Sequence, residues 1–293
     1  MALQNTMSVD STVRPQTRAH TGLQQGVDLH WPASAIWHPG EPKVYAIGLT
    51  DLKDALAKGI EDFKAIPSFA VFLVIIYPIA GLILFRLIFG YNVLPLIYQM
   101  LAGFTLLGPA AASGLYELSR RRERGLETSA SHIFDVFHSP STGAIARLSL
   151  SLLAIFFAWL ATAKMMFEQI VGTAVPTSIE TFANQIVGTP AGHSLIIVGN
   201  SVGLLFAVLV LVVTFVSFPM LVDRPVSAST AVRTSIRAVL ESPLTVAMWG
   251  LFVAAALLIG ALPFFIGLAV VFPILGHATW HLYRRVVSPD EVI

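Results

Sequence analysis

Residues 244–283 read LTVAMWGLFVAAALLIGALPFFIGLAVVFPILGHATWHLY, an apolar stretch of about 40 residues. A helix that crosses the hydrocarbon core of a bilayer needs only about 20 apolar residues. The stretch therefore predicts two spans with a break between them. Pro263 supplies the break, because proline cannot continue a helix that is already hydrogen-bonded. We expect one span over residues 244–262 and another over residues 264–283.

Four earlier stretches are also long and apolar enough to cross a bilayer: residues 68–89, 94–118, 145–170 and 195–222. Charged residues make up only 12% of the chain, about half of their share in a typical soluble domain. The predicted fold class is all-α, a polytopic membrane protein with six transmembrane helices in three hairpins. Residues 46–293 would form this domain, after a polar and mostly disordered tail over residues 1–45.

Positive charge is sorted along the sequence. Sixteen of the 18 Lys and Arg residues lie in four patches that alternate with the predicted hairpins, and the connections within the hairpins carry none. Positively charged loops stay in the cytoplasm during insertion, whereas uncharged loops cross. We therefore expect a multi-pass protein of the bacterial inner membrane, with both termini cytoplasmic and the 172–194 loop periplasmic.

An amphipathic segment followed by proline introduces each predicted hairpin, over residues 51–66, 129–138 and 227–242. Such segments suit the plane of the membrane interface, with the apolar stripe toward the acyl chains. A proline also lies inside each even-numbered span, at Pro109, Pro219 and Pro273. The pattern predicts a degenerate internal triplication. The alternative is that prolines are simply common in membrane helices.

His277 and His281 form the first candidate site. Their spacing puts both imidazoles on one helix face, where they could share a metal or where one could be an axial haem ligand. No Glu follows His277 as the HExxH zinc motif requires. Both lie just before Arg284 and Arg285, so we interpret them as anchors at headgroup depth. Gln should then replace either histidine with little effect.

Two further groups are candidates for contacts with the membrane and for helix packing. Arg120, Arg121, Arg122 and Arg124 end a predicted span, where arginines set topology and contact anionic lipid headgroups, so losing one should be tolerated. Gly199 and Gly203 form a Gly-x-x-x-Gly motif, which lets a neighbouring helix approach closely. The chain has no cysteine, which excludes disulfides and thiolate chemistry.

Four strings carry a family resemblance: YPIAGLILFR, GFTLLGPAAASGLYELSRRRERGL, SFPMLVDRP and PILGHATWHLYRRVV. They resemble the DUF2189 family of bacterial integral membrane proteins, over roughly residues 45–287. The family has no defined function, although some members carry the label of a cytochrome c oxidase subunit. The resemblance therefore implies a membrane protein and assigns no catalytic or binding residue.

The expected function is that of a non-enzymatic accessory, scaffold or assembly factor for a larger membrane complex, a respiratory complex being one option. Its partners would be membrane lipids and other subunits, with no nucleic acid, metal or cofactor. One alternative is a transporter or permease for a small or amphipathic solute, because internal repeats and broken helices are found in transporters. The other is a haem or metal-binding membrane protein that uses His277 and His281.

Overall fold

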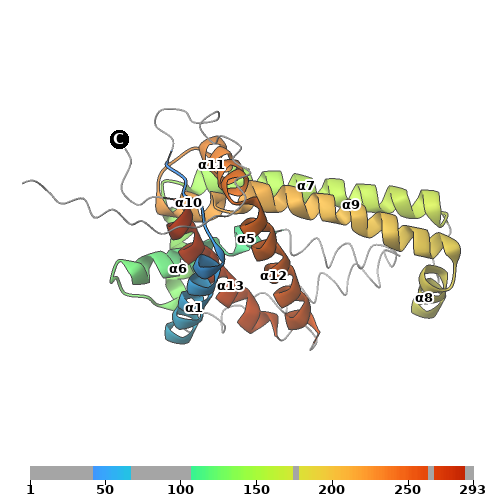
Figure 1. The fold of residues 1–293 in the computed structure, drawn as a ribbon, viewed down its shortest axis with the longest axis horizontal. Coiled ribbons are helices and arrows are strands. Elements are labelled where there is room, and N and C mark those ends of the chain that lie inside the picture. Colours follow the sequence, from blue (N-terminus) through green and yellow to red (C-terminus); the bar gives the residue numbers. More distant parts are fainter. Residues whose placement is uncertain (1–41, 67–106, 174–177, 263–266, 288–293) are drawn as a thin grey trace, which may run out of the picture. The chain divides into compact units, whose positions relative to one another are not determined.

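The structure is a computed structural model, and it describes residues 42–66, 107–173, 178–262 and 267–287. The chain divides into two units, Met1–Pro32 and Ala33–Ile293, and every described residue lies in the second. The described residues are mostly helical (Figure 1). Their helices are α1 (Leu49–Ala65), α5 (Gly108–Ala111), α6 (Ser113–Glu123), η4 (Ala130–His138), α7 (Thr142–Ile170), α8 (Ile179–Val187), α9 (Pro190–Thr214), α10 (Ser217–Asp223), α11 (Ala228–Glu241), α12 (Pro243–Ala261) and α13 (Leu268–Val286).

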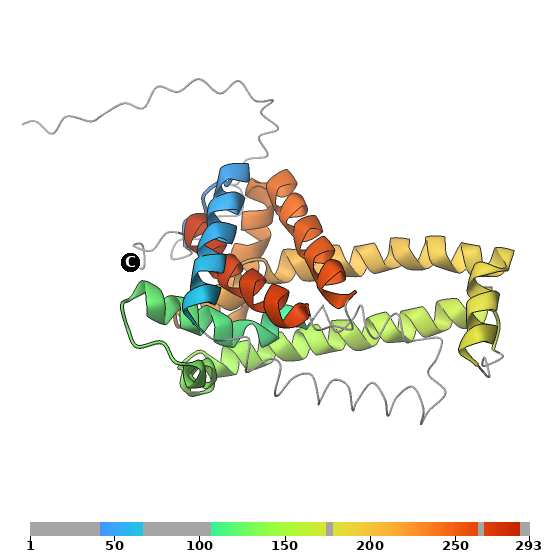
Figure 2. The same cartoon turned by 90° about the horizontal axis from the view of Figure 1, so that it is seen from below.

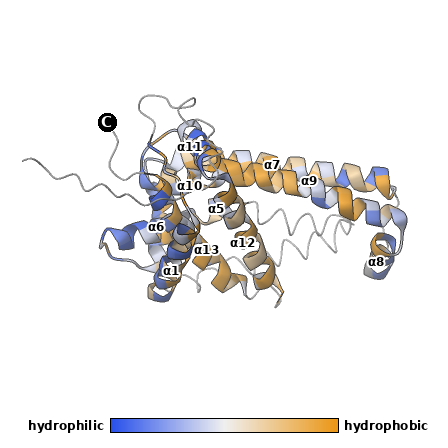
Figure 3. Cartoon of the chain, viewed as in Figure 1, coloured by the Kyte–Doolittle hydropathy of each residue, from blue (hydrophilic) through white to orange (hydrophobic). Residues whose placement is uncertain are grey.

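Three of these helices are long and apolar enough to cross a membrane: α7, α9 with its continuation α10, and α12. They correspond to the expected spans 145–170, 195–222 and 244–262. Apolar residues cover most of their length, whereas α6 is largely polar and α1 mixes polar and apolar residues (Figure 3). α7 and α9 run side by side, as the two ribbon views show (Figures 1 and 2). Exposed large side chains such as Phe157, Leu205 and Leu251 give these helices an apolar outer surface.

The expected arrangement of six spans is not confirmed. The expected span 68–89 lies outside the described residues, and so does the 94–118 span as far as residue 106. The rest of that second span forms α5 and α6, which meet at Ala112. The expected span 264–283 corresponds to α13, which is not among the helices that qualify as candidate spans. The physical reason is that its second half carries two histidines and two arginines.

Side-chain caps begin the helices around α9. Ser178 Oγ accepts a hydrogen bond from Thr181 N at 3.1 Å, which starts α8. Thr189 Oγ1 accepts from Gly192 N at 3.0 Å, and Pro190 occupies the first position of α9. Serine and threonine suit this role because they satisfy backbone N–H groups that have no partner within the helix. The 172–194 connection thus contains a helix where the sequence analysis expected a loop.

The helix that continues from α9 into α10 is interrupted at Phe215 and Val216, and serines satisfy the backbone there. Ser235 Oγ of α11 donates to Val212 O at 2.7 Å and accepts from Val216 N at 3.4 Å. Ser217 Oγ shares its one hydrogen between Val213 O and, at 3.1 Å, Ala231 O. The interruption is therefore held against α11, and it lies just before the proline that the sequence analysis singled out at position 219.

The amphipathic segments are helical as expected, but small residues form much of the buried face of α1 and α11. In α11 the buried residues include Ala231, Thr234, Ser235 and Ala238. In α1 the buried residues are Ala55, Gly59 and Asp62. Large apolar residues of the predicted stripes, such as Leu56 and Val232, remain half-buried. The second segment, residues 129–138, forms a 3-10 helix, η4, whose exposed Phe134 and Phe137 rings stack with centroids 6.5 Å apart.

Candidate functional site

The candidate site forms where α13 packs between α1 and α6. Small residues allow this approach: a Cβ at Gly59 would lie 2.6 Å from Ala278 N, and one at Gly276 would lie 2.5 Å from Leu115 Cδ1. The chain just before α1 also pairs with the end of α13. Val44 forms an antiparallel bridge with Val287, and Tyr45 N donates a hydrogen bond to Val286 O at 2.8 Å. These contacts bring together polar side chains that are far apart in the sequence.

Five of those side chains form a polar cluster, which we define as Asp62, Ser119, Arg122, His277 and His281. Ser119 Oγ donates to Asp62 Oδ2 at 2.6 Å and lies 2.7 Å from His277 Nδ1. A hydroxyl has a single hydrogen, which Ser119 gives to Asp62. His277 must therefore carry its proton on Nδ1 and donate it to Ser119 Oγ. His281 Nε2 lies 2.8 Å from the same carboxylate oxygen.

Arg122 completes the surroundings of Asp62. Its Nη1 donates to Asp62 Oδ1 at 3.0 Å and to Glu61 O at 2.8 Å. Burial of Asp62, which is 5% exposed, by itself opposes ionisation. The hydrogen bonds from His281 and Ser119, together with the electrostatic interactions with His281 and His277, outweigh this effect and hold the pKa of Asp62 below its ordinary value. Asp62 is therefore an ionised carboxylate that joins three helices.

Two other carboxylates fix the last turns of α13. Glu123 accepts from Trp280 Nε1 and from Arg284 Nε, each at 3.0 Å. Asp223 accepts from Tyr283 Oη at 2.8 Å and from Arg284 Nη1 at 3.4 Å. Glu123 belongs to α6 and Asp223 belongs to α10, so side-chain hydrogen bonds join the end of α13 to both helices.

The arginines expected to contact lipid headgroups all face carboxylates of the protein. Arg120 makes two 2.8 Å hydrogen bonds to Glu117. Arg121 lies 3.1 Å from Asp135, and Arg124 lies 3.3 Å from Asp223. Arg122 pairs with Asp62, as described above. The sequence analysis identified the cluster but not these partners, which lie up to 99 residues away along the chain.

The interpretation of the two histidines as anchors at headgroup depth is wrong for His277, which is 0% exposed. His281 is also mostly buried, at 15% exposure of its side chain. An anchor would present its polar tip to headgroups, whereas here both rings bond to protein groups. Within the described ranges, no group of three or more His, Cys, Asp or Glu residues could hold a metal ion.

The contact of serine, histidine and aspartate does not have the order of a nucleophilic triad. In such a triad, histidine lies between the serine and the carboxylate. Here Ser119 lies between His277 and Asp62, and its side chain is 0% exposed. The arrangement is suited to holding helices together and not to attack on a substrate.

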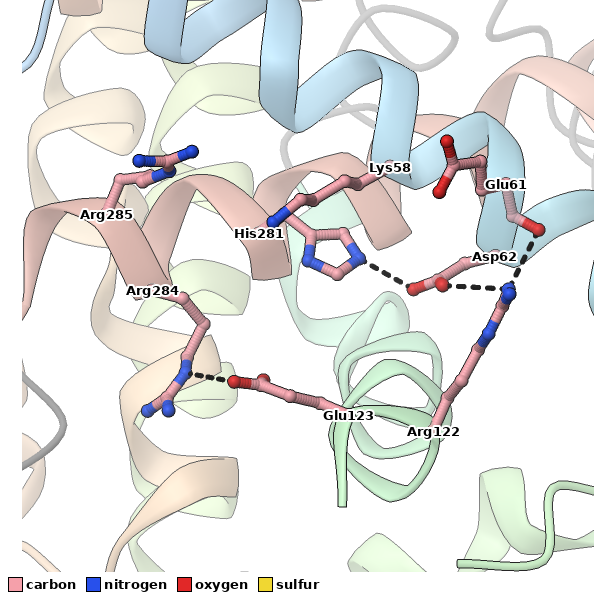
Figure 4. A pocket seen from close by; sticks show the side chains of 8 residues that line it. All are labelled: Lys58, Glu61, Asp62, Arg122, Glu123, His281, Arg284 and Arg285. Carbon is pink, nitrogen blue, oxygen red and sulfur yellow. Dashed lines mark hydrogen bonds and ion pairs between the residues drawn. The ribbon is translucent and has the colours of Figure 1, made fainter. Parts of the chain in front are cut away.

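An open pocket of about 410 Å³ lies beside the polar cluster. Its positively charged lining comes from Lys58, Arg122, Arg284 and Arg285, and its carboxylates are Glu61, Asp62 and Glu123. His281 also lines it. Figure 4 shows these side chains projecting from α1, α6 and α13, with Arg122 bonded to Asp62 and Arg284 bonded to Glu123.

The two glycines expected to serve helix packing lie on α9, facing α7. A Cβ at Gly203 would come within 3.1 Å of the Trp159 ring, so the helices approach closely there. Gly199 is less crowded, with Met166 Cε 3.9 Å from the same constructed position. Asn200 and Ser201, between them, donate to Ile196 O and Ile197 O of their own helix. The close contact of α9 with α7 is made at Gly203, where the glycine backbone lies against the Trp159 ring.

Asp62, Ser119 and Asp223 are the residues that the sequence analysis missed. A signal for Asp62 was present, because this residue continues the face of Ala55 and Gly59 at helical spacing. A carboxylate on a small-residue face indicates a buried partner. Ser119 gives no comparable signal, since one serine before four arginines is ordinary.

Three of the described helices are long and apolar enough to cross a membrane, which suits an integral membrane protein. Residues 96–223 match the family described as predicted integral membrane protein, DUF2189. This match confirms the resemblance over those residues, and it agrees with the three described helices that are long and apolar enough to cross a membrane. No curated protein and no solved structure matches the chain.

Proposed function

We propose that this chain is a non-enzymatic accessory or scaffold subunit of a larger membrane complex. The apolar helices α7, α9 and α12 would lie in the bacterial inner membrane. The polar helices α1 and α6 and the end of α13 would form a cytoplasmic cap, which we define as residues 49–65, 113–123 and 275–286. The observation that carries the proposal is the polar cluster, in which Asp62 joins these three helices.

The bonding within the cap supports a structural role. Asp62, Glu123 and Asp223 each accept hydrogen bonds from side chains of at least one other helix. A network of this kind rigidifies a surface, because moving one helix leaves a buried charge without its partner. The outward face of α1 carries Lys53, Lys64 and other exposed charges that are available to a partner.

Affinity capture in mild detergent tests the proposal. We expect the same membrane protein to co-purify with the wild type in repeated preparations, and to be lost when α1 carries Lys53→Glu and Lys64→Glu. The matched control is Glu180→Lys, an exposed charge reversal on α8. If no membrane protein enriches with wild type, or if all three proteins capture the same set, the accessory role is excluded.

The interruption between α9 and α10 favours a second candidate, a transporter or permease for a small or amphipathic solute. Transporters bind solutes where helices are broken inside the membrane. Phe215 and Val216 are buried at this interruption, so a solute path would need the interruption to open. A thiol reagent that cannot cross membranes should label Val216→Cys if this path exists. Protection of that cysteine in intact cells and in opened membranes would exclude the path.

A further inference from the structure

The pocket beside the polar cluster has hydrogen-bond donors in excess of acceptors. Lys58 lines it and makes no ion pair or hydrogen bond to any other described residue. Arg122 makes both of its bonds through Nη1, so Nε and Nη2 have no acceptor among the residues that the structure describes. Arg284 bonds through Nε and Nη1, which leaves Nη2 without an acceptor within the same ranges.

Three carboxylates line the pocket, and none of them uses this excess: the side chain of Glu61 is exposed and accepts no hydrogen bond from a described residue, and the other two are occupied. Asp62 is occupied by Ser119, His281 and Arg122. Glu123 uses one oxygen for Trp280 and the other for Arg284. The remaining positive charges belong to three helices that line one hollow (Figure 4). Guanidinium groups whose positions are fixed by carboxylates are well placed to receive a second anion, because little side-chain freedom is lost on binding.

We propose that this pocket binds a phosphate group through Lys58, Arg122 and Arg284. The volume of about 410 Å³ lies within the range of small-molecule pockets. Phosphate oxygens would accept from the uncommitted N–H groups of the two arginines and from the Lys58 ammonium, which are strong charge-assisted bonds. The phosphate belongs either to an anionic lipid headgroup or to a soluble phosphate compound, since both present the same oxygens. This binding function is independent of the proposed accessory role.

Lys58→Gln is the decisive variant, because this side chain bonds to no described residue and its loss leaves the polar cluster intact. Lys53→Gln is the matched control on the same helix, since Lys53 is exposed and lies outside the pocket lining. Wild type and both variants would be placed in phosphatidylcholine nanodiscs and titrated with inorganic phosphate at constant ionic strength. A second set of nanodiscs would contain phosphatidylglycerol. The thermal unfolding midpoint and ³¹P NMR would report binding.

We expect saturable binding to the wild type and to Lys53→Gln, and binding about tenfold weaker in Lys58→Gln, as suits the loss of one charged hydrogen bond. A response to inorganic phosphate would identify a soluble ligand, and a response in phosphatidylglycerol nanodiscs alone would identify a lipid headgroup. Equal responses of the two variants in both arms would overturn the proposal, because the effect would then reflect overall charge. Absence of any response in the wild type would overturn it as well.

Discussion

Gly59 of α1 lies so close to Ala278 of α13 that a Cβ at residue 59 would come within 2.6 Å of the Ala278 backbone nitrogen. The atom it would meet is backbone, which cannot rotate away. This crossing is what places Asp62, the next buried residue of α1, against His281.

Gly59→Ala should therefore destabilise the protein although alanine favours helices. Overpacking of this kind costs roughly 1–3 kcal/mol, which thermal or denaturant unfolding in detergent would measure. The matched control is Gly143→Ala in α7, where the nearest atom to the new methyl group is an arginine nitrogen at 4.0 Å. The control should be neutral or slightly stabilising. Equal effects of the two substitutions would contradict the close crossing.

Asp62→Asn should be among the most destabilising single substitutions in α1. It removes the negative charge that accepts from His281 and Arg122 and leaves the Arg122 guanidinium near a buried neutral amide. Because Asp62 is buried but the Arg122 side chain is 38% exposed, solvent screens part of the loss, and the cost should be roughly 1–3 kcal/mol. Asp54→Asn is the control, since its partner Arg285 is exposed and the pair contributes little. Equal free energies of unfolding in the two variants would argue against the polar cluster.

The same carboxylate predicts a pH dependence in the acid range. The pKa of Asp62 is held below its ordinary value in the folded protein, whereas in the unfolded chain it should be about 3.9. The stability from Asp62 is then fully present above the unfolded pKa and is lost as the pH falls through the folded pKa. The difference in unfolding free energy between wild type and Asp62→Asn should thus shrink below about pH 4. A constant difference down to lower pH would contradict this.

His277→Gln should reduce stability, in contrast to the tolerance that the sequence pattern suggested. His277 is fully buried and its Nδ1 lies 2.7 Å from Ser119 Oγ. The Gln amide would not occupy the position of the imidazole, so either Ser119 or the amide would lack a hydrogen bond. The free energy of unfolding should fall by roughly 1–3 kcal/mol. Unfolding of purified His277→Gln and His281→Gln would be compared with Thr279→Val, a control at a half-buried position of the same α13, whose hydroxyl donates to Leu275 O within the helix. Wild-type stability of His277→Gln would restore the anchor interpretation.

Orientation can be tested by labelling on this cysteine-free background. A cysteine at the exposed position Asn184 should react with an impermeant thiol reagent once the outer membrane is permeable. A cysteine at the exposed position Arg233 should react only after the inner membrane is opened. The reverse pattern would invert the proposed topology.

Periodicity and hydropathy predicted those features of the fold that depend on residues close together in the sequence. The bounds of α7 and α12 follow from runs of apolar residues, and α1 follows from its amphipathic spacing. The same rules found His277, His281 and the arginines but not the protein groups to which they bond. A histidine near the end of an apolar helix has the same neighbours in the sequence whether its ring faces lipid or Asp62. The difference lies in a crossing between α1 and α13, which no local pattern specifies.

The serines at the α9–α10 interruption also have bonding partners that the sequence does not indicate. The residues around Ser217 in the sequence do not indicate that its hydroxyl contacts Ala231 O of α11. Ser235 lies on the buried face of an amphipathic helix and satisfies both Val212 O and Val216 N. Their importance comes from backbone groups of another segment, so only the assembled structure identifies it.

The distance along the chain between Asp62 and His281 has a consequence for biogenesis. The two residues are 219 positions apart, and at about 5–20 residues per second a ribosome needs roughly 10–40 s to synthesise that length. During that interval α1 has emerged without the helix that receives it, and its carboxylate has no histidine to meet. The first described helix is thus completed by the last, and a nascent chain that stalls before α13 presents an unfinished surface to the proteases and chaperones of the membrane.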